Sequence, residues 1–123
     1  MILLDSNTII YFSSPGFYDL RTEYSNHELA ASAISRIEVL GYHSLEHDKK
    51  QDFEDYFASI LVFDMTSDVV ERAISLRQER KIGLGDAIVA ATALVHDLTL
   101  ATRNTKDFKW IESLVLIDPF DED

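Results

Sequence analysis

Short apolar runs alternate with amphipathic stretches along the chain, and this alternation predicts strands and helices in turn. The apolar runs cover residues 2–4, 29–35, 61–63, 98–102 and 114–117. Runs of this length are typical of strands that are buried on both faces of a parallel sheet. The run at 29–35 is rich in Ala, so residue preferences alone also allow a helix there; we interpret it as a strand.

Between these runs, apolar residues recur three or four positions apart, which predicts helices that bury one face. Phe53, Phe57 and Ile60 follow this spacing, with acidic residues between them. The segment 86–96 is apolar on nearly every side, which is typical of a helix enclosed by other elements. The predicted helices cover residues 7–12, 17–24, 36–45, 48–60, 69–80, 86–96 and 104–111.

Strands that alternate with helices predict an α/β fold with right-handed crossovers. We therefore expect a three-layer α/β/α sandwich with a mostly parallel central sheet. A chain of 123 residues buries roughly two thirds of its unfolded surface, which is enough for one core. We expect residues 1–123 to form a single domain.

Polar residues stand where strands give way to helices. Asp5 follows the first run, Glu38 belongs to the helix after the second, and Asp86 opens the apolar helix. Asn104 and Asp107 follow the fourth run. Because the carboxyl ends of parallel strands lie along one edge of such a sheet, residues far apart in the sequence can meet there. The pattern predicts one acidic cluster at that edge.

Each of these residues also has a purely structural interpretation. Asp5 and Asn104 can cap the helices that follow them. Glu38 stands three residues after Ser35, which is the spacing of a capping box. Asp86 gains stability from the dipole of its helix, and the glycines on either side of Leu84 would let the backbone turn it inward. Capping and chemistry are compatible, so the cluster stays a hypothesis at this point.

The amino-acid composition excludes several kinds of site and of catalytic group. The chain has no Cys, which excludes disulfides, thiolate zinc sites and cysteine nucleophiles. His43 and His47 are four residues apart, but a zinc site needs further ligands that the pattern does not supply. The chain has no apolar stretch of about 18 residues and no basic segment before its first apolar run, so we expect a cytoplasmic protein that does not enter membranes.

The formal net charge of −11 argues against a nucleic-acid partner, because phosphate contacts normally come from Lys and Arg. Divalent cations held by several carboxylates would weaken that objection. The candidate phosphate contacts are Lys49, Lys50, Arg77, Arg80, Lys81, Arg103, Lys106 and Lys109. For each of them, a solvated surface position is the alternative.

Four segments together resemble the PIN-domain ribonucleases, and among them the VapC-like toxins of type II toxin–antitoxin systems. They are Ile-Leu-Leu-Asp-Ser-Asn at 2–7, Ile-Glu-Val-Leu-Gly-Tyr at 37–42, Leu-Gly-Asp-Ala-Ile-Val-Ala-Ala-Thr-Ala at 84–93 and Ala-Thr-Arg-Asn-Thr-Lys-Asp-Phe at 101–108. The resemblance spans nearly the whole chain, and the order of the four segments makes it more specific than any one of them.

This resemblance implies that Asp5, Glu38 and Asp86 hold one or two Mg²⁺ or Mn²⁺ ions, with Asn104 or Asp107 as a fourth member of the site. Some relatives have Asp at the position of Asn104, which leaves a second metal site open. The implied activity is metal-dependent endoribonucleolytic hydrolysis that leaves 5′-phosphate and 3′-hydroxyl ends. The implied partners are an RNA substrate, a second copy of the chain, and a cognate antitoxin whose segment, often bearing Arg, enters the acidic groove.

Three alternatives remain. A phospho-acceptor signalling domain has a similar architecture, and Asp64 could imitate its acceptor, but that family needs two adjacent acids after the first strand and Lys after the last. Here Ser6 follows Asp5, and Asp118-Pro119 follows the last run. A PIN-like module that binds a partner without cutting is a second alternative. A structure-specific DNA nuclease is the third, although such enzymes usually carry additional elements.

Overall fold

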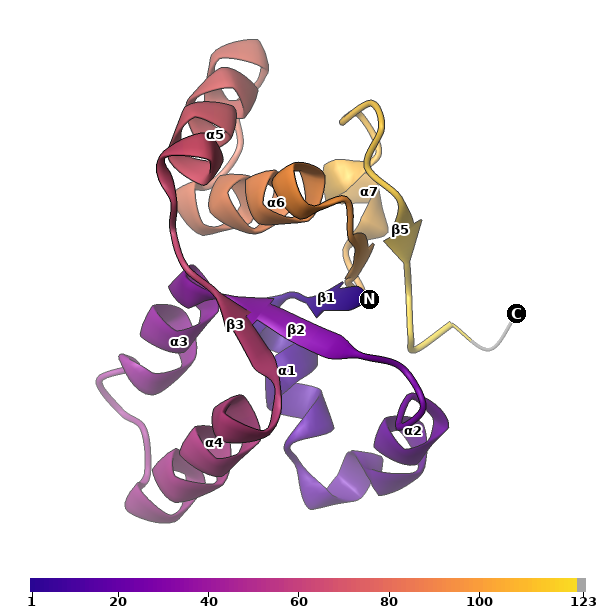
Figure 1. Ribbon diagram of the computed structural model, residues 1–123. Helices are drawn as coiled ribbons and strands as arrows, with labels where there is room; N and C mark the ends of the chain where they lie inside the picture. Colours follow the sequence, from indigo (N-terminus) through magenta and orange to yellow (C-terminus); the bar gives the residue numbers. More distant parts are fainter. Residues whose placement is uncertain (122–123) are drawn as a thin grey trace.

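A five-stranded parallel sheet forms the centre of the computed structural model, which describes residues 1–121 (Figure 1). The strands are β1 (Ile2–Leu4), β2 (Leu29–Ser32), β3 (Leu61–Phe63), β4 (Thr99–Ala101) and β5 (Leu116–Ile117). Their order across the sheet is β3-β2-β1-β4-β5. The chain moves outward from β1 to β3 and then crosses to the other side of β1, so the order reverses beside the central strand. Such a reversal is where open α/β sheets place their sites.

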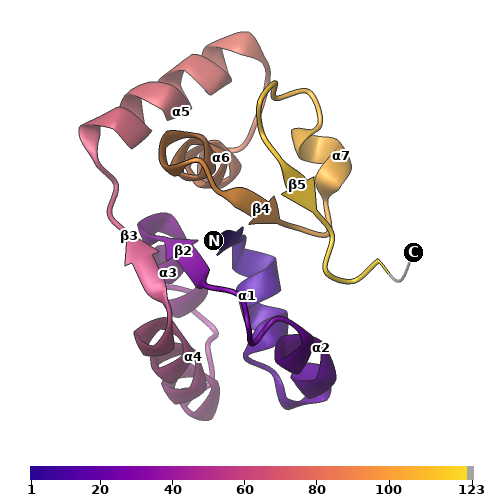
Figure 2. The same cartoon turned by 45° about the vertical axis from the view of Figure 1, so that its right-hand side comes forward.

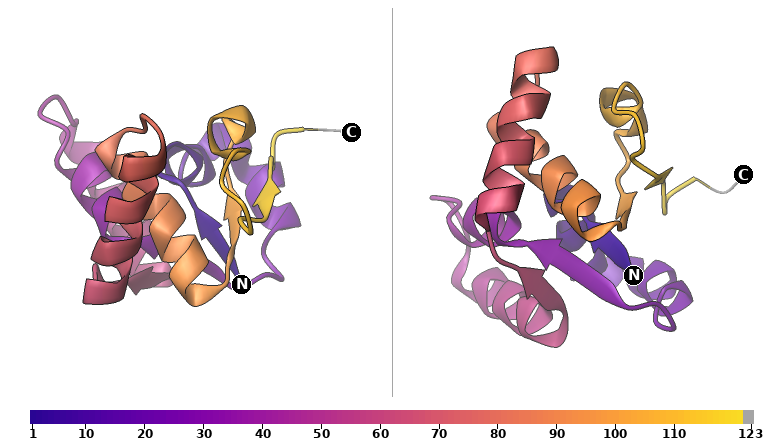
Figure 3. Two further views of the ribbon diagram at one scale, coloured as in Figure 1. Left: turned by 90° about the horizontal axis from the view of Figure 1, so that it is seen from above. Right: turned by 45° about the horizontal axis from the view of Figure 1, so that its top comes forward.

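Helices cover both faces of this sheet, as expected for a three-layer sandwich. They are α1 (Ser6–Phe12), the 3₁₀ helix η1 (Pro15–Phe17), α2 (Tyr18–Glu23), α3 (Ala33–Leu40), α4 (His47–Ser59), α5 (Ser67–Glu79), α6 (Leu84–His96) and α7 (Thr105–Phe108). In Figures 1 and 2, α5, α6 and α7 lie above the sheet and α1 to α4 lie below it. Figure 3 shows α5 beside α6, which packs against it.

The alternation of side chains along β1 divides the core into two layers. Leu3 is fully buried against the upper helices, in a cluster with Val69 of α5 and Val89 of α6. Ile2 and Leu4 point the other way, where Leu4 is buried in a cluster with Phe12 of α1. A strand that is apolar at every position is therefore what this central place requires.

The Ala-rich segment behaves partly as predicted. Its first four residues form β2, but α3 already begins at Ala33, because the Ser32 hydroxyl oxygen caps it by accepting from Ile34 N at 3.4 Å. Ser35 is therefore inside the helix, so the predicted strand to Ser35 and the capping box with Glu38 are wrong. The helix ends at Leu40, short of the predicted end near residue 45, and Gly41 N donates to Ile37 O at 2.8 Å.

The remaining elements follow the predicted order, with ends that differ from the predicted ones by a few residues. The last strand is two residues long instead of four, and α7 forms a single turn inside the predicted 104–111 segment. The helix with the apolar pattern begins at Leu84, two residues before the predicted start, so Asp86 lies in its first turn. Within residues 1–121, no helix is long and apolar enough to span a bilayer.

Candidate active site at the carboxyl edge of the sheet

Asp5 lies directly after the central strand β1 and is almost fully buried. Its backbone N donates to Ala101 O of β4 at 3.2 Å, which fixes the residue at the point where the strand order reverses. Its Oδ1 accepts from Thr8 N at 2.8 Å, so the predicted cap of α1 is confirmed. A carboxylate has acceptor capacity beyond this single bond, so the cap does not prevent a second role.

Glu38 reaches the same edge from the second turn of α3, although the prediction placed it in the first turn. Its Oε1 accepts a hydrogen bond from Ser6 Oγ at 2.8 Å. Ser6 Oγ also lies 2.9 Å from Ser35 Oγ, in hydrogen-bond contact. Ser6 follows Asp5 in the chain, so this pair of bonds brings Glu38 beside the end of β1. Ser35 was predicted only as a cap, and no sequence signal indicated this contact.

The start of α6 approaches Glu38 closely. A side chain at Gly85 would place its Cβ 2.5 Å from Glu38 Oε2, closer than real Cβ atoms come. No glycine in residues 1–121 has a positive φ, so the predicted role of Gly83 and Gly85 in turning the backbone is not the reason for Gly85. Its lack of a side chain makes room for the Glu38 carboxylate.

Asp86 follows Gly85 and has a raised pKa. Desolvation is the largest cause, followed by the negative charges of Asp5, Glu38 and Asp107, in that order. Asp86 is exposed as a residue, so the desolvation reflects atoms crowded around its carboxyl group rather than full burial. Like charges raise a carboxyl pKa only at short range. Asp5, Glu38 and Asp107 are therefore near enough to Asp86 to raise its pKa, and we call these four residues the acidic edge.

The turn after β4 contributes Asp107 through its side chain and Asn104 through its backbone. Asn104 N donates to the buried Thr102 Oγ1 at 3.1 Å, and Asn104 O accepts from Asp107 N at 2.9 Å. The Asn104 side chain makes no capping hydrogen bond, so its predicted capping role is wrong. Among the described residues, the charge of Asp107 helps to raise the pKa of Asp86, whereas the backbone of Asn104 stabilises the turn that carries Asp107.

The chemistry of this donor set fits a hard divalent cation. Carboxylate oxygens are ligands that Mg²⁺ accepts, and the mutual repulsion that raises the Asp86 pKa is what a cation would remove. Within residues 1–121, no group of three or more acidic or histidine side chains is arranged so that it could hold a metal ion by itself. Mg²⁺ usually keeps several waters and takes one or two carboxylates together with substrate phosphates. The acidic edge therefore suits an open site completed by water and substrate.

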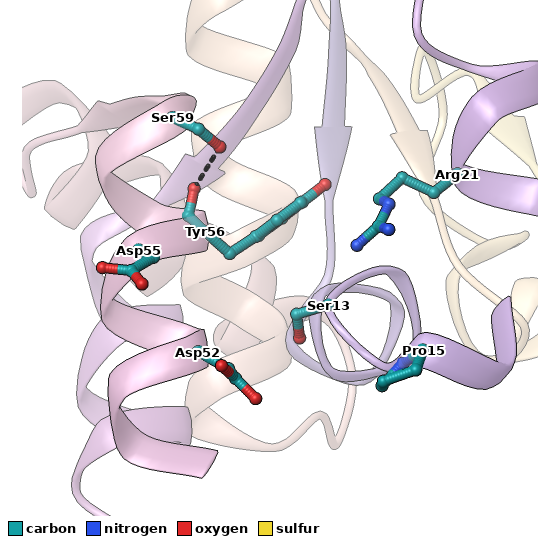
Figure 4. A pocket seen from close by; sticks show the side chains of 7 residues that line it. All are labelled: Ser13, Pro15, Arg21, Asp52, Asp55, Tyr56 and Ser59. Atoms are coloured by element: carbon teal, nitrogen blue, oxygen red, sulfur yellow. Dashed lines mark hydrogen bonds between the residues drawn. The ribbon is translucent and has the colours of Figure 1, made fainter. Parts of the chain in front are cut away.

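A pocket of about 580 Å³ lies away from the acidic edge, between α4 and the segment from Ser13 to α2 (Figure 4). The Tyr56 hydroxyl points across it toward Arg21. That hydroxyl is buried and has no hydrogen-bond partner among the described residues, and burial raises the pKa of Tyr56 to about 12. Asp52 and Asp55 lie exposed at its wall. None of the predicted site residues lines this pocket, which we call the α2–α4 pocket.

Comparison with known proteins now decides the family. The PIN domain family matches residues 2–112. The chain belongs to the PIN-domain family. Ribonuclease VapC10 from Mycobacterium tuberculosis is 35% identical to this PIN domain over 91 residues, which cover 70% of the present chain and 67% of VapC10. The family prediction is confirmed, and the phospho-acceptor alternative is excluded.

Solved structures agree with this assignment. A chain of a toxin–antitoxin complex from Klebsiella pneumoniae superimposes with a TM-score of 0.79 at 33% identity, covering 98% of this PIN domain and 99% of that chain. A chain of VapBC2 from Rickettsia felis, bound to a DNA fragment from its promoter, gives a TM-score of 0.78 at 28% identity, covering 96% and 98%. The predicted three-layer α/β/α fold with a parallel sheet is confirmed.

Proposed function

We propose that this protein is an endoribonuclease that requires Mg²⁺ or Mn²⁺ and acts as the toxin of a toxin–antitoxin pair. The observation that carries the proposal is the approach of Asp5, Glu38 and the start of α6 at one edge of the sheet, where Ser6 Oγ donates to Glu38 Oε1 and Gly85 leaves room for that carboxylate. Desolvation, followed by the charges of Asp5, Glu38 and Asp107, raises the pKa of Asp86 at this place. In a PIN-domain chain, unrelieved crowding of this kind marks a place for cations and for the phosphates they attract. The similarity to a ribonuclease over two thirds of its length supports RNA as the substrate.

Asp5, Glu38 and Asp86 would hold the cation, and Asp107 is the better placed candidate for the fourth position, with Asn104 as the alternative. When bound, a divalent ion would lower the pKa of a water and neutralise charge on the reacting phosphate. Asp5 is held rigidly by its bond to Thr8 N, and Ser6 orients the Glu38 carboxylate. These contacts keep the carboxylates at one edge before substrate arrives, which reduces the ordering cost of the reaction.

No side chain is required as a nucleophile in this scheme, because water attacks the phosphodiester. The expected products therefore carry 5′-phosphate and 3′-hydroxyl ends. Analysis of fragment ends distinguishes this outcome from attack by a ribose hydroxyl, which would leave cyclic phosphates and 5′-hydroxyl ends.

A cognate antitoxin protein is the proposed regulatory partner. The structural relatives include a chain of a toxin–antitoxin complex from Klebsiella pneumoniae. The net charge of −11 and the acidic edge favour a basic segment through complementary charge. An arginine placed among the four carboxylates would relieve the same repulsion as a metal ion. We further propose that the protein forms a homodimer and acts in the cytoplasm.

The test of this function is cleavage of an end-labelled total small-RNA pool by purified protein. The reaction is run with Mn²⁺, with EDTA, and with an identically prepared Asp86→Asn variant. Cleavage that needs Mn²⁺ and disappears in the variant supports the proposal. Equal cleavage by both proteins would mean a contaminating nuclease. Absence of cleavage, together with Mn²⁺ binding by calorimetry that does not depend on Asp5 or Asp86, would favour a PIN module that binds without cutting.

A further inference from the structure

A pocket of about 350 Å³ adjoins the acidic edge on the side of α6 and α7. Its lining residues are Arg80, Lys81, Ile82, Gly83, Asp86, Lys106, Asp107 and Trp110. Two members of the acidic edge thus share a hollow with three cationic side chains, in a chain that has 11 Lys and Arg in total against 22 acids. We call this hollow the basic pocket.

The cations of the basic pocket are available for a ligand. Lys81 and Lys106 are exposed, and neither forms an ion pair with any residue between 1 and 121. The two acids that line the pocket therefore do not neutralise them at close range. Phosphate contacts are normally made by cations of this kind, and each one neutralised by phosphate contributes to affinity and to its salt dependence.

Another part of the lining of the basic pocket is aromatic and is held by contacts of Arg80 and Trp110. The Arg80 guanidinium carbon lies 5.4 Å from the centre of the Trp110 ring, within the range of a cation–π contact. Trp110 Nε1 donates to Asp107 O at 2.9 Å, so the ring is tied to a residue of the acidic edge. Arg77 Nη1 donates to Ile82 O at 3.2 Å and holds the segment that carries Lys81.

The start of α6 also lines the basic pocket, through Gly83 and Asp86. Gly83 caps this 13-residue helix without any side-chain hydrogen bond, and a Cβ on Gly83 would meet nothing within 4 Å. The first backbone N–H groups of a helix have no partners inside it and carry partial positive charge. Here they open into a space that already contains cations and an aromatic ring.

A nucleotide carries a phosphate and a flat base, and the basic pocket offers a partner for each. Single-stranded nucleic acid is bound by this combination, with cations along the backbone and aromatic or guanidinium planes against the bases. Most of this protein's charge repels RNA, so a local patch of free cations beside the acidic edge is where a strand gains most.

We propose that the basic pocket binds the nucleotide next to the cleaved phosphodiester of a single-stranded RNA segment. Lys81, Lys106 and the start of α6 hold its phosphate, and the Arg80–Trp110 pair packs against its base. This inference rests on the proposed function for the position of the cut, whereas the binding itself is measurable without cleavage.

Trp110 is the single tryptophan of the chain, so its fluorescence reports directly on the pocket. The probe is a pool of random single-stranded RNA hexamers, titrated in Ca²⁺ and again in EDTA, with anisotropy of the same labelled pool as an independent measure of binding. The test variant is Lys81→Gln with Lys106→Gln. The control is Arg36→Gln with Arg72→Gln, which changes the charge equally at exposed positions on α3 and α5 that do not line the pocket.

We expect a saturable change in Trp110 fluorescence in wild type and in the control. We expect the affinity of the test variant for RNA to be at least about tenfold weaker. The slope of log K against log salt concentration should be smaller in magnitude by about 1.4, since each phosphate contact contributes roughly 0.7 for single strands. Thermal melting confirms that both double variants are folded.

Three results would overturn the inference. The first is binding that is detected by anisotropy, without a change in Trp110 fluorescence and with equal affinity in the test and control variants. The second is no binding by wild type in either condition. The third is the same Trp110 change with hexaglutamate, which would identify a general anion site. The Mn²⁺ cleavage assay decides the proposed function separately, because an enzyme that cuts RNA but fails these tests keeps its function and loses only this subsite.

Discussion

The acidic edge and the α2–α4 pocket both carry aspartates beside a hollow in the surface, yet the surroundings of these aspartates differ. Asp55 is exposed, and its Oδ1 accepts from Gln51 Nε2 at 2.9 Å within the same helix. Asp86 is also exposed, but desolvation of its carboxyl group, followed by the charges of three other carboxylates, raises its pKa. The α2–α4 pocket is the larger of the two hollows beside these aspartates, at about 580 Å³ against about 350 Å³ for the basic pocket. The proposed site is therefore not beside the larger hollow; it lies where carboxylates are crowded at the carboxyl edge of the sheet.

The largest difference between the two regions is expected when one aspartate in each is neutralised. Asp86→Asn is expected to lower the rate of RNA cleavage at least about 100-fold, because it removes a proposed metal ligand. Asp55→Asn is expected to leave the rate within about twofold. Single-turnover cleavage of one RNA identified from the small-RNA pool measures both. Equal rates for the two variants would remove the functional distinction between the regions.

Gly85→Ala tests whether space at the acidic edge matters separately from charge. Its Cβ would lie 2.5 Å from Glu38 Oε2, at the flexible end of that side chain. The carboxylate can move aside, so the free energy of unfolding is expected to change by less than about 1 kcal/mol, while cleavage falls about tenfold or more. Urea denaturation and single-turnover cleavage give the two quantities. Gly16→Ala is the control, because a Cβ there meets nothing within 4 Å; a matching loss in that variant would contradict the explanation.

Ser6→Ala removes the hydrogen bond that orients Glu38 and keeps all four charges. A hydrogen bond to a charged group contributes roughly 1.5–3 kcal/mol where it is fully realised. Because Glu38 is exposed, we expect a smaller effect, with cleavage reduced about three- to tenfold. Ser6→Thr restores a hydroxyl and should recover most of the rate. Ser25→Ala serves as control, since its hydroxyl bonds only a nearby backbone oxygen, Thr22 O, at 2.7 Å. No loss in Ser6→Ala would show that Glu38 is positioned without this bond.

The smallest expected effect is on stability and depends on pH. The pKa of Asp86 is higher in the folded protein than its ordinary value of 3.8. The folded state therefore binds a proton more readily than the unfolded state, and its stability falls as the pH rises above that ordinary value. In EDTA, Asp86→Asn should gain stability relative to wild type between pH 4 and pH 7. Urea denaturation across this range measures it, and Mn²⁺ should reverse the order. A constant difference across the range would contradict the pKa shift.

The pattern of apolar and polar residues was sufficient to predict the layers of the fold and the position of Asp5. The unbroken apolar run at 2–4 is typical of a central strand that is buried on both faces. An acid directly after such a strand lies at the carboxyl edge of the sheet. The apolar segment that begins near Asp86 was equally informative, since a helix without a polar face must be enclosed. These predictions succeeded because burial on all sides leaves few arrangements.

The start of α3 could not be read in the same way. Alanine favours helices but is also found in buried strands, so an Ala-rich segment does not show where β2 ends and the helix begins. The prediction took Ser35 as the cap. The structure selects Ser32, which places Ser35 beside Ser6 instead. The role of Gly85 could not be predicted from the sequence either, because it depends on the side chain of Glu38, 47 positions earlier. Contacts between distant segments of this kind follow from packing and leave no local pattern.

The order of the strands has a consequence for synthesis on the ribosome. The central strand is made first, but its neighbour on one side, β4, comes only at Thr99–Ala101. The acidic edge likewise joins Asp5 to Asp86 and Asp107. A nascent chain that has reached residue 80 therefore holds half of the carboxylates and none of the basic pocket beyond Arg80. The proposed nuclease is inert throughout most of its own translation, so a partner has until release of the last third of the chain to be ready for it.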